Sequence, residues 1–98
     1  MFVDLIVVGG GAAGLFAAIT CAENSEKSVL VLEKTPRLLH KVKISGGGRC
    51  NVTHHCFEPR ELSRNYPRGE KSLIGPMHRF GAADTVDWFA GRGVTLKT

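Results

Sequence analysis

A glycine-rich turn between two short apolar runs constrains this chain more than any other feature of its sequence. The run Leu5-Ile6-Val7-Val8 leads directly into Gly9-Gly10-Gly11-Ala12-Ala13-Gly14. Glycines with the spacing G-x-G-x-x-G permit a tight turn, a close approach of the backbone to a phosphate, and close packing of a helix on a strand. The pattern therefore predicts a strand, a phosphate-binding turn and a helix whose N-terminus faces the phosphate.

An acidic residue stands at the end of the second apolar run, Val29-Leu30-Val31-Leu32. Glu33 follows Gly14 by 19 residues, and dinucleotide-binding units place an acceptor for the ribose hydroxyls about 20 residues beyond the glycines. The carboxylate also disfavours a 2′-phosphate, because like charges repel. A glycine-rich turn alone is a weak signal, and an ordinary turn that binds no nucleotide is the alternative. The preceding strand, the small residues of the helix and the acid together favour a nucleotide-binding β-α-β unit.

The order of apolar and polar segments predicts an α/β fold with a parallel sheet, in the form of a Rossmann-like unit. We expect a strand over residues 2–8, a helix over 12–22 and a second strand over 27–33 that returns through a right-handed crossover. The first strand is apolar almost throughout, which is typical of a parallel strand covered on both faces. Residues 34–53 show no strong helix or strand period.

The second half of the chain carries weaker signals. Residues 59–76 are polar and contain turn-forming Gly and Pro residues, so they predict a connector with little internal order. Asp84 is a candidate N-cap for a short helix through Phe89, which the glycines of segment 91–93 would end. The apolar residues of segment 94–96 then predict the start of another strand.

Composition narrows the class of protein. The chain has 98 residues, of which 43% are hydrophobic and 22% charged, as expected of one small globular domain. Segment 5–22 carries no charge, but its glycines and its strand-turn-helix pattern favour burial on a sheet over a membrane span. No basic segment or cleavage site precedes the first strand, so we expect no leader, and three cysteines are an odd number. We therefore expect a cytoplasmic protein without structural disulfides.

Positive charge is concentrated in one part of the chain. The net charge is +4, and segment 34–57 holds five basic residues and no acidic one. Such a segment suits a phosphate ligand, a nucleic acid or an acidic partner, or it is simply a solvated basic loop. Within it, Gly46-Gly47-Gly48 precede Arg49, so that successive backbone N–H groups and a guanidinium are available to an anion. A flexible hinge is the alternative interpretation of these glycines.

Four stretches form a set that is more specific than any one motif. They are Gly9-Gly10-Gly11-Ala12-Ala13-Gly14, Leu32-Glu33-Lys34, Ile44-Ser45-Gly46-Gly47-Gly48-Arg49-Cys50-Asn51-Val52-Thr53 and Asn65-Tyr66-Pro67-Arg68-Gly69. This set resembles the BaiN/RdsA-type family of NAD(P)/FAD-dependent oxidoreductases. Phe80-Gly81 and the segment 84–89 also resemble that family, so the resemblance covers the whole chain.

The resemblance implies a flavoprotein with FAD as its cofactor, NAD(P)H as a candidate electron donor and a small molecule as its substrate. Members of the family are longer, so residues 1–98 are expected to be the N-terminal part of an FAD/NAD(P)-binding Rossmann-like domain. The rest of that domain and the substrate domain would lie outside it. The resemblance also implies that segment 94–96 begins an antiparallel hairpin, whereas pattern alone predicts a third parallel strand.

The predicted cofactor-binding residues come from the glycine turn, the end of the second strand and the second glycine block. They are Gly9, Gly11, Ala12, Ala13, Gly14, Glu33, Lys34, Lys41, Ser45, Gly46, Gly47, Gly48, Arg49, Cys50 and Asn51. Lys34, Lys41 and the second block are carried over from the resemblance. The chain departs from the family pattern at Leu39, where Gly is usual, and at Lys43, where an apolar residue is usual.

No catalytic acid or base is identified, and no metal site is expected. Cys50, His54, His55 and Cys56 lie close together in the sequence, but their spacing differs from that of zinc sites. The function that we predict is the FAD-binding portion of a flavin-dependent oxidoreductase, without a membrane partner. The alternatives are a nucleic-acid-associated flavoprotein, which the lack of interleaved aromatic residues disfavours, an NAD-binding module without flavin, and a cofactor-free structural module.

Overall fold

The computed structural model describes residues 1–98, except for the surroundings of Gly48. The predicted cofactor role of Gly48 therefore lies outside the described residues. Two compact units divide the chain, Met1–Asn51 and Val52–Thr98. The predicted nucleotide-binding unit lies entirely within the first.

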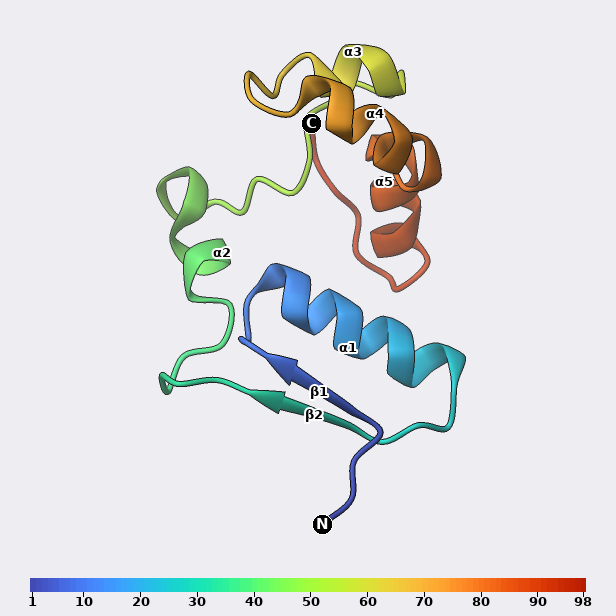
Figure 1. Ribbon diagram of the computed structural model, residues 1–98. Helices are drawn as coiled ribbons and strands as arrows, with labels where there is room; N and C mark the ends of the chain where they lie inside the picture. The colour runs from blue at the N-terminus through green and yellow to red at the C-terminus, as the bar shows by residue number, and fades with distance from the viewer. The chain divides into compact units, whose positions relative to one another are not determined.

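The first unit contains the predicted strand-turn-helix-strand. Strand β1 (Leu5–Val8) leads into helix α1 (Ala12–Asn24), and strand β2 (Val29–Leu32) returns parallel to β1, with Leu5 opposite Val29 and Val8 opposite Leu32 (Figure 1). The sequence analysis placed these elements correctly, although the strands are shorter and the helix is longer than expected. Helix α1 packs on one face of the two strands.

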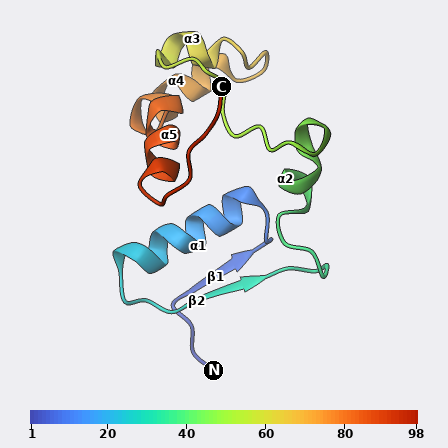
Figure 2. The same ribbon diagram turned by 180° about the vertical axis from the view of Figure 1, so that it is seen from behind.

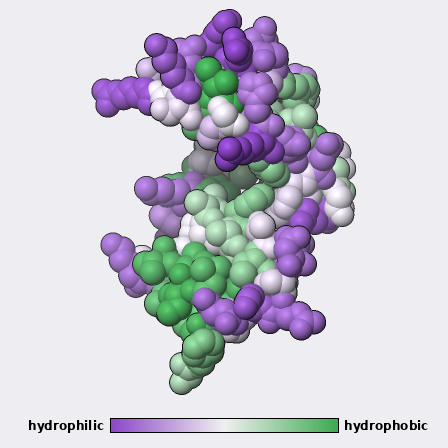
Figure 3. All heavy atoms as spheres, turned by 45° about the vertical axis from the view of Figure 1, so that its right-hand side comes forward, coloured by the Kyte–Doolittle hydropathy of each residue, from purple (hydrophilic) through white to green (hydrophobic). Residues whose placement is uncertain are grey.

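Only one face of this sheet is covered within the described residues. Leu5 and Val7 are half-buried beneath α1, whereas Ile6 and Val8 point to the other face and are 52% and 84% exposed. The expectation of a strand covered on both faces is therefore wrong for this chain, because α1 is the layer that packs on the two strands. Exposed apolar residues produce a hydrophobic patch near the N-terminal segment (Figure 3).

Reciprocal hydrogen bonds close the end of the sheet where both strands begin. The Asp4 N–H donates to Ser28 Oγ at 3.0 Å, and Ser28 donates from its N–H and its hydroxyl to Asp4 Oδ2 at 2.9 and 3.1 Å. The Leu5 N–H also donates to the Ser28 carbonyl at 3.1 Å. These bonds fix the register of two strands that are too short to fix it by packing alone.

The segment after Glu33 contains short helices where no helix was predicted. Helix α2 (His40–Ile44) is followed by the 3-10 segment η1 (Ser45–Gly48). Leu39, which precedes α2, adopts the left-handed conformation at φ 55° and ψ 34°. The Lys43 N–H donates to the Leu39 carbonyl at 3.0 Å, so α2 begins directly from this turn.

The second unit is helical. It contains α3 (Pro59–Ser63), α4 (Glu70–Arg79) and α5 (Ala82–Ala90), and α3 packs against α4 (Figure 2). The prediction of a poorly ordered connector over 59–76 is therefore wrong.

Local signals explain both of the unexpected helices. The Glu58 carboxylate caps α3 by accepting from the N–H groups of Arg60 and Glu61, with Pro59 in the first turn. Half-buried Leu73 and Met77 give α4 an apolar side, and the helix continues through Pro76.

Helix α5 begins earlier than predicted. Gly81 is its N-cap, and Asp84 lies in the first turn, where its carboxylate accepts from the Gly81 N–H at 2.8 Å. The Asp84 N-cap prediction is therefore wrong, because this carboxylate reaches back to the cap residue. Gly91 ends the helix as expected.

The strand predicted at 94–96 is absent from the secondary structure of the described residues. The Val94 N–H instead donates to the Phe89 carbonyl at 2.9 Å and extends the turn after α5. Among the helices that the structure describes, none combines the length and the apolar character needed to cross a membrane.

Candidate nucleotide-binding site

Two glycines give the turn after β1 its shape. Gly9 has φ 104°, a left-handed conformation that favours glycine, and its N–H donates to the Leu32 carbonyl at 2.7 Å. A Cβ on Gly14 would collide with the Gly9 carbonyl oxygen and would lie 3.1 Å from Val7 Cγ1. Gly9 therefore permits the turn, and Gly14 permits close packing of α1 on β1, as the motif predicts.

The N-terminus of α1 is open to a ligand at Gly11. No described heavy atom lies within 4 Å of the position that a Cβ on Gly11 would occupy. Gly11 is the N-cap, the Leu15 N–H donates to its carbonyl at 3.0 Å, and the first turn of α1 contains no acidic residue. The N–H groups of a first helical turn lack partners within the helix, and the helix dipole is positive at this end. The geometry therefore suits a phosphate group that approaches Gly11 and Ala12.

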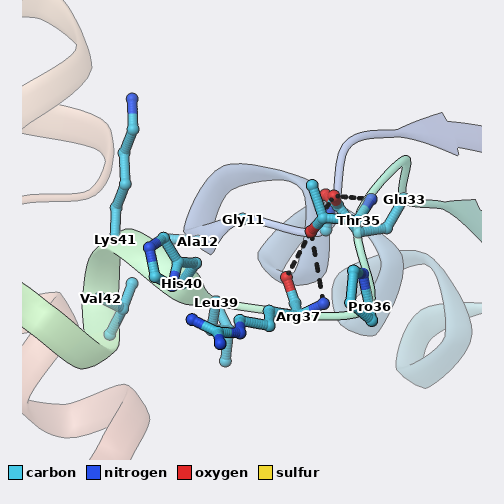
Figure 4. Close-up of a pocket in the computed structure, with 11 residues that line it drawn as sticks. Gly11, Ala12, Glu33, Thr35, Pro36, Arg37, Leu39, His40, Lys41 and Val42 are labelled. Carbon is cyan, nitrogen blue, oxygen red and sulfur yellow. Dashed lines mark hydrogen bonds between the residues drawn. The ribbon is translucent and has the colours of Figure 1, made fainter.

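Glu33 lies at the carboxyl end of β2 and accepts three hydrogen bonds from its own chain. Oε1 accepts from the Gly10 N–H at 2.9 Å, and Oε2 accepts from both the N–H and the hydroxyl of Thr35 at 2.8 Å (Figure 4). The hydrogen bond from Gly10, followed by those from Thr35, lowers the pKa of Glu33 from 4.5 to about 2. The carboxylate is therefore ionised and oriented at neutral pH.

The segment after Glu33 folds back on Gly10. The Leu39 N–H donates to the Gly10 carbonyl at 2.8 Å, and Gly10 is buried. A Cβ on Gly10 would contact Leu38 Cδ2 and would lie 3.4 Å from Glu33 Cβ. The Gly10 N–H therefore binds the Glu33 carboxylate, and the Gly10 carbonyl binds the Leu39 N–H, so both groups hold the chain after β2 against the glycine turn. The sequence analysis missed Gly10 because it occupies a position that the motif leaves variable.

A pocket of about 650 Å³ lies where these elements meet (Figure 4). Its lining consists of Gly10, Gly11, Ala12, Glu33, Thr35, Pro36, Arg37, Leu39, His40, Lys41 and Val42. Its volume falls in the range of about 300–1,000 Å³ that is usual for small-molecule sites. A pocket at the carboxyl ends of parallel strands is also where α/β sheets bind ligands.

Four of the predicted residues line this pocket, namely Gly11, Ala12, Glu33 and Lys41. The side chain of Lys41 extends away from the Glu33–Thr35 hydrogen bonds (Figure 4). The loop residues Thr35, Pro36 and Arg37 were not predicted. A signal for Thr35 was present, because a hydroxyl two residues beyond an acid at a turn often bonds to that acid or to nearby backbone.

Two glycines of the second glycine block adopt a conformation that favours glycine. Gly46 and Gly47 are left-handed, with φ of 58° and 67°, and the Arg49 N–H donates to the Gly46 carbonyl at 3.3 Å. A Cβ on Gly46 would lie 2.7 Å from Asn51 Nδ2, so the Asn51 side chain packs on this glycine. Such a turn presents backbone groups on one side, but the block is not among the residues that line the pocket.

The remaining predicted residues lie outside the pocket lining, and all but Ser45 are exposed. Ala13, Lys34, Arg49, Cys50 and Asn51 lie on the surface, whereas Ser45 is half-buried and donates from its hydroxyl to the Val42 carbonyl at 2.9 Å. Their roles toward a cofactor stay predictions. Within the described part of the chain, no group of three or more His, Cys, Asp or Glu side chains is placed to hold a metal ion.

Comparison with known proteins gives one family and several relatives. The family model for the HI0933-like protein Rossmann domain matches residues 3–98. The chain is 29% identical over 93 residues to a 3-dehydro-bile acid delta(4,6)-reductase of Clostridium scindens, with 94% of this chain covered. It is 33% identical over 91 residues to the ribosomal RNA dihydrouridine synthase of Escherichia coli and 34% over 90 residues to that of Haemophilus influenzae, with 93% and 92% of this chain covered.

The relatives are much longer than this chain. The aligned part is 22% of the Clostridium protein, 22% of the Escherichia protein and 21% of the Haemophilus protein. Each relative therefore contains long segments without a counterpart among these 98 residues.

Proposed function

Because this chain belongs to the HI0933-like Rossmann-domain family, we propose that it is the FAD-binding portion of a flavin-dependent oxidoreductase. The observation that carries this proposal is the pocket in which the open Gly11 and the ionised Glu33 both lie. A nucleotide there would meet backbone N–H groups at one end and a carboxylate at the other. That is the combination a pyrophosphate and a ribose require.

The residues of this chain would bind and orient the cofactor. Gly11 and Ala12 would approach the pyrophosphate at the N-terminus of α1, and Glu33 would accept from the adenosine ribose. The second glycine block with Arg49 would supply a further contact. When bound, the flavin supplies the redox chemistry, while the protein supplies binding, orientation and electrostatics.

The same proposal covers the substrate, the electron donor and the location of the whole protein. Two of the compared relatives differ in the substrate that their names specify, a 3-dehydro-bile acid and ribosomal RNA. We propose a small-molecule substrate for the whole protein, NAD(P)H as its electron donor, and the cytoplasm as its location, where its three free cysteines stay reduced.

The test is whether the full-length protein carries flavin at the predicted site. The purified protein should show the absorption bands of oxidised flavin, and Gly11→Val should lose them while its circular dichroism stays unchanged. Gly75→Val is the matched control, because a Cβ at Gly75 also meets no described atom within 4 Å and this residue lies in α4, outside the pocket lining. Flavin retained in stoichiometric amount by Gly11→Val would refute the site.

A second candidate is a flavoprotein that acts on RNA. It is favoured by the names of two relatives, both ribosomal RNA dihydrouridine synthases, and by the acid-free basic segment 34–57. Such a protein should bind an RNA hairpin with an affinity that falls steeply with salt. Lys43→Glu, on α2 and outside the pocket lining, should weaken that binding without loss of flavin. RNA binding that is undetectable at low salt would remove this candidate.

A further inference from the structure

The hydroxyl of Thr35 joins the Glu33 carboxylate to the turn that follows it. At 2.8 Å from Glu33 Oε2, it is close enough for a strong charge-assisted hydrogen bond. The same oxygen lies 3.3 Å from both the N–H and the carbonyl oxygen of Arg37 (Figure 4). Because a hydroxyl has one proton, the shorter bond to Glu33 takes it, and the Arg37 N–H donates to the remaining lone pairs. The hydroxyl is thereby oriented toward Glu33.

The hydrogen bonds around Glu33 use most of its acceptor capacity. An ionised carboxylate offers about four lone-pair positions, two on each oxygen. Thr35 fills both positions on Oε2 with its N–H and its hydroxyl, and Gly10 fills one position on Oε1. One position remains, and it belongs to Oε1. A ribose offers two hydroxyls, so this carboxylate cannot accept equally from both.

We propose that Thr35 is a positioning residue that leaves Oε1 of Glu33 to accept from a single ribose hydroxyl, an inference that rests on the function proposed above. Thr35 lines the same pocket as Glu33 and reaches it from the loop beyond β2. Its hydroxyl therefore determines which oxygen is available and how selective the site is among ribose hydroxyls. Without that hydroxyl, Oε2 regains a free position and the carboxylate can accept from either ribose hydroxyl.

The experiment compares three nucleotides in the flavin-free full-length protein. ADP, 2′-deoxy-ADP and 3′-deoxy-ADP are titrated by calorimetry into the wild type, Thr35→Val and Thr35→Ser. Removal of the accepted hydroxyl should weaken binding to the wild type about tenfold, and removal of the other hydroxyl should change it little. Thr35→Val keeps the shape and the backbone N–H but lacks the hydroxyl, so the ratio of the affinities for the two deoxynucleotides should approach one. Thr35→Ser restores the hydroxyl and should restore the ratio.

A control separates this effect from the general loss of a surface hydroxyl. The exposed Ser25 hydroxyl also donates to an oxygen of its own chain, the Cys21 carbonyl at 2.7 Å, but Ser25 is not part of the pocket lining. Ser25→Ala should therefore leave the ratio of the affinities for the two deoxynucleotides at its wild-type value.

Each other outcome overturns the inference in a distinct way. If Thr35→Val weakens all three nucleotides by one factor, or leaves all three unchanged, Thr35 has no positioning role although the nucleotide site stands. If the wild type does not distinguish the two deoxynucleotides, the count of acceptor positions is wrong. If the wild type binds none of the three, the proposed nucleotide site fails and the role of Thr35 fails with it.

Discussion

Leu39 is held in a left-handed conformation while its N–H donates to the carbonyl oxygen of Gly10 at 2.8 Å. Among the described residues other than glycine, Leu39 alone has a positive φ. The family pattern usually has Gly at this position, and the conformation explains why. The hydrogen bond to Gly10 brings the segment after Glu33 across the glycine turn, so the strained residue shapes one wall of the pocket that also contains Gly11 and Glu33.

Replacement of Leu39 by glycine should therefore stabilise the protein. A left-handed conformation costs a residue with a Cβ about 1–2 kcal/mol, and part of that gain is offset by the greater freedom of glycine in the unfolded chain. We expect a net gain of about 1 kcal/mol for Leu39→Gly in chemical denaturation. Leu38→Gly is the matched control, since Leu38 is not among the residues with a positive φ, and it should give no gain. A loss of stability in Leu39→Gly would show that the packing of this leucine outweighs its strain.

The pKa of Glu33 predicts a specific dependence of stability on pH. Because the folded pKa of about 2 lies below the ordinary value of 4.5, the folded state favours the ionised form. The contribution of Glu33 to stability is therefore complete above about pH 4.5 and is lost as the pH falls toward 2. The difference in melting temperature between the wild type and Glu33→Gln should be constant from neutral pH down to about pH 5 and shrink below it.

An NMR titration and a charge control test whether Glu33 itself causes this pH dependence. Carbon NMR of the labelled side chain should show Glu33 titrating near pH 2, and Thr35→Val should raise this pKa because it removes one of the stabilising hydrogen bonds. Glu26→Gln, at an exposed carboxylate before β2, controls for the loss of one negative charge. A Glu33 titration near its ordinary pKa would contradict the hydrogen bonds from Gly10 and Thr35.

Arg49 tests whether the second glycine block contacts the cofactor. If its guanidinium lies near the pyrophosphate or the flavin, Arg49→Ala should lower the affinity for FAD by a larger factor than the affinity for AMP, because AMP lacks those groups. Arg37 provides the contrast, since it lines the pocket with Glu33 and should affect both ligands alike if it acts near the adenosine. Affinities for FAD and AMP are measured by fluorescence quenching and calorimetry. Equal losses for the two ligands in Arg49→Ala would place Arg49 near the adenosine instead.

The parts of this site that local sequence determines were predicted, and the parts that depend on folding back were missed. Gly9, Gly14 and Glu33 were recognised because strand, turn and helix impose fixed spacings on them. Gly10 was missed because the motif leaves its position variable, although its N–H donates to Glu33. Thr35 was missed because the bond from its hydroxyl to Glu33 has only a short-range signal, an acid followed two residues later by a hydroxyl. Leu39 was noticed only as a departure from a family pattern, and its backbone angles gave the reason.

The errors in the second half have a similar origin. Turn-forming Gly and Pro residues suggested a connector over 59–76, yet the Glu58 cap and the packing of α3 against α4 produce helices there. Glu58 followed by Pro59 is a helix-start signal that our sequence analysis did not use. A strand at 94–96 needs a partner strand, and propensity cannot supply one.

The exposed face of the sheet predicts how the 98 residues behave when expressed alone. Ile6, Val8 and Leu32 are 52%, 84% and 47% exposed, and apolar patches of this kind on a parallel sheet favour association. We therefore expect the chain of residues 1–98 to self-associate. We also expect it to lose added FAD on gel filtration, because the bound flavin would stay largely open to water.

A charged pair on that face should suppress the association. Val8 and Leu32 are opposite each other in the parallel register, so Val8→Lys combined with Leu32→Glu places unlike charges side by side. Light scattering should then show a larger monomer fraction, whereas Val94→Lys, at an exposed apolar residue of the second unit, should leave association unchanged. A wild-type chain of 98 residues that is monomeric, yellow and bleached by NADH or NADPH would show that the sheet needs no second covering layer for binding or for electron transfer.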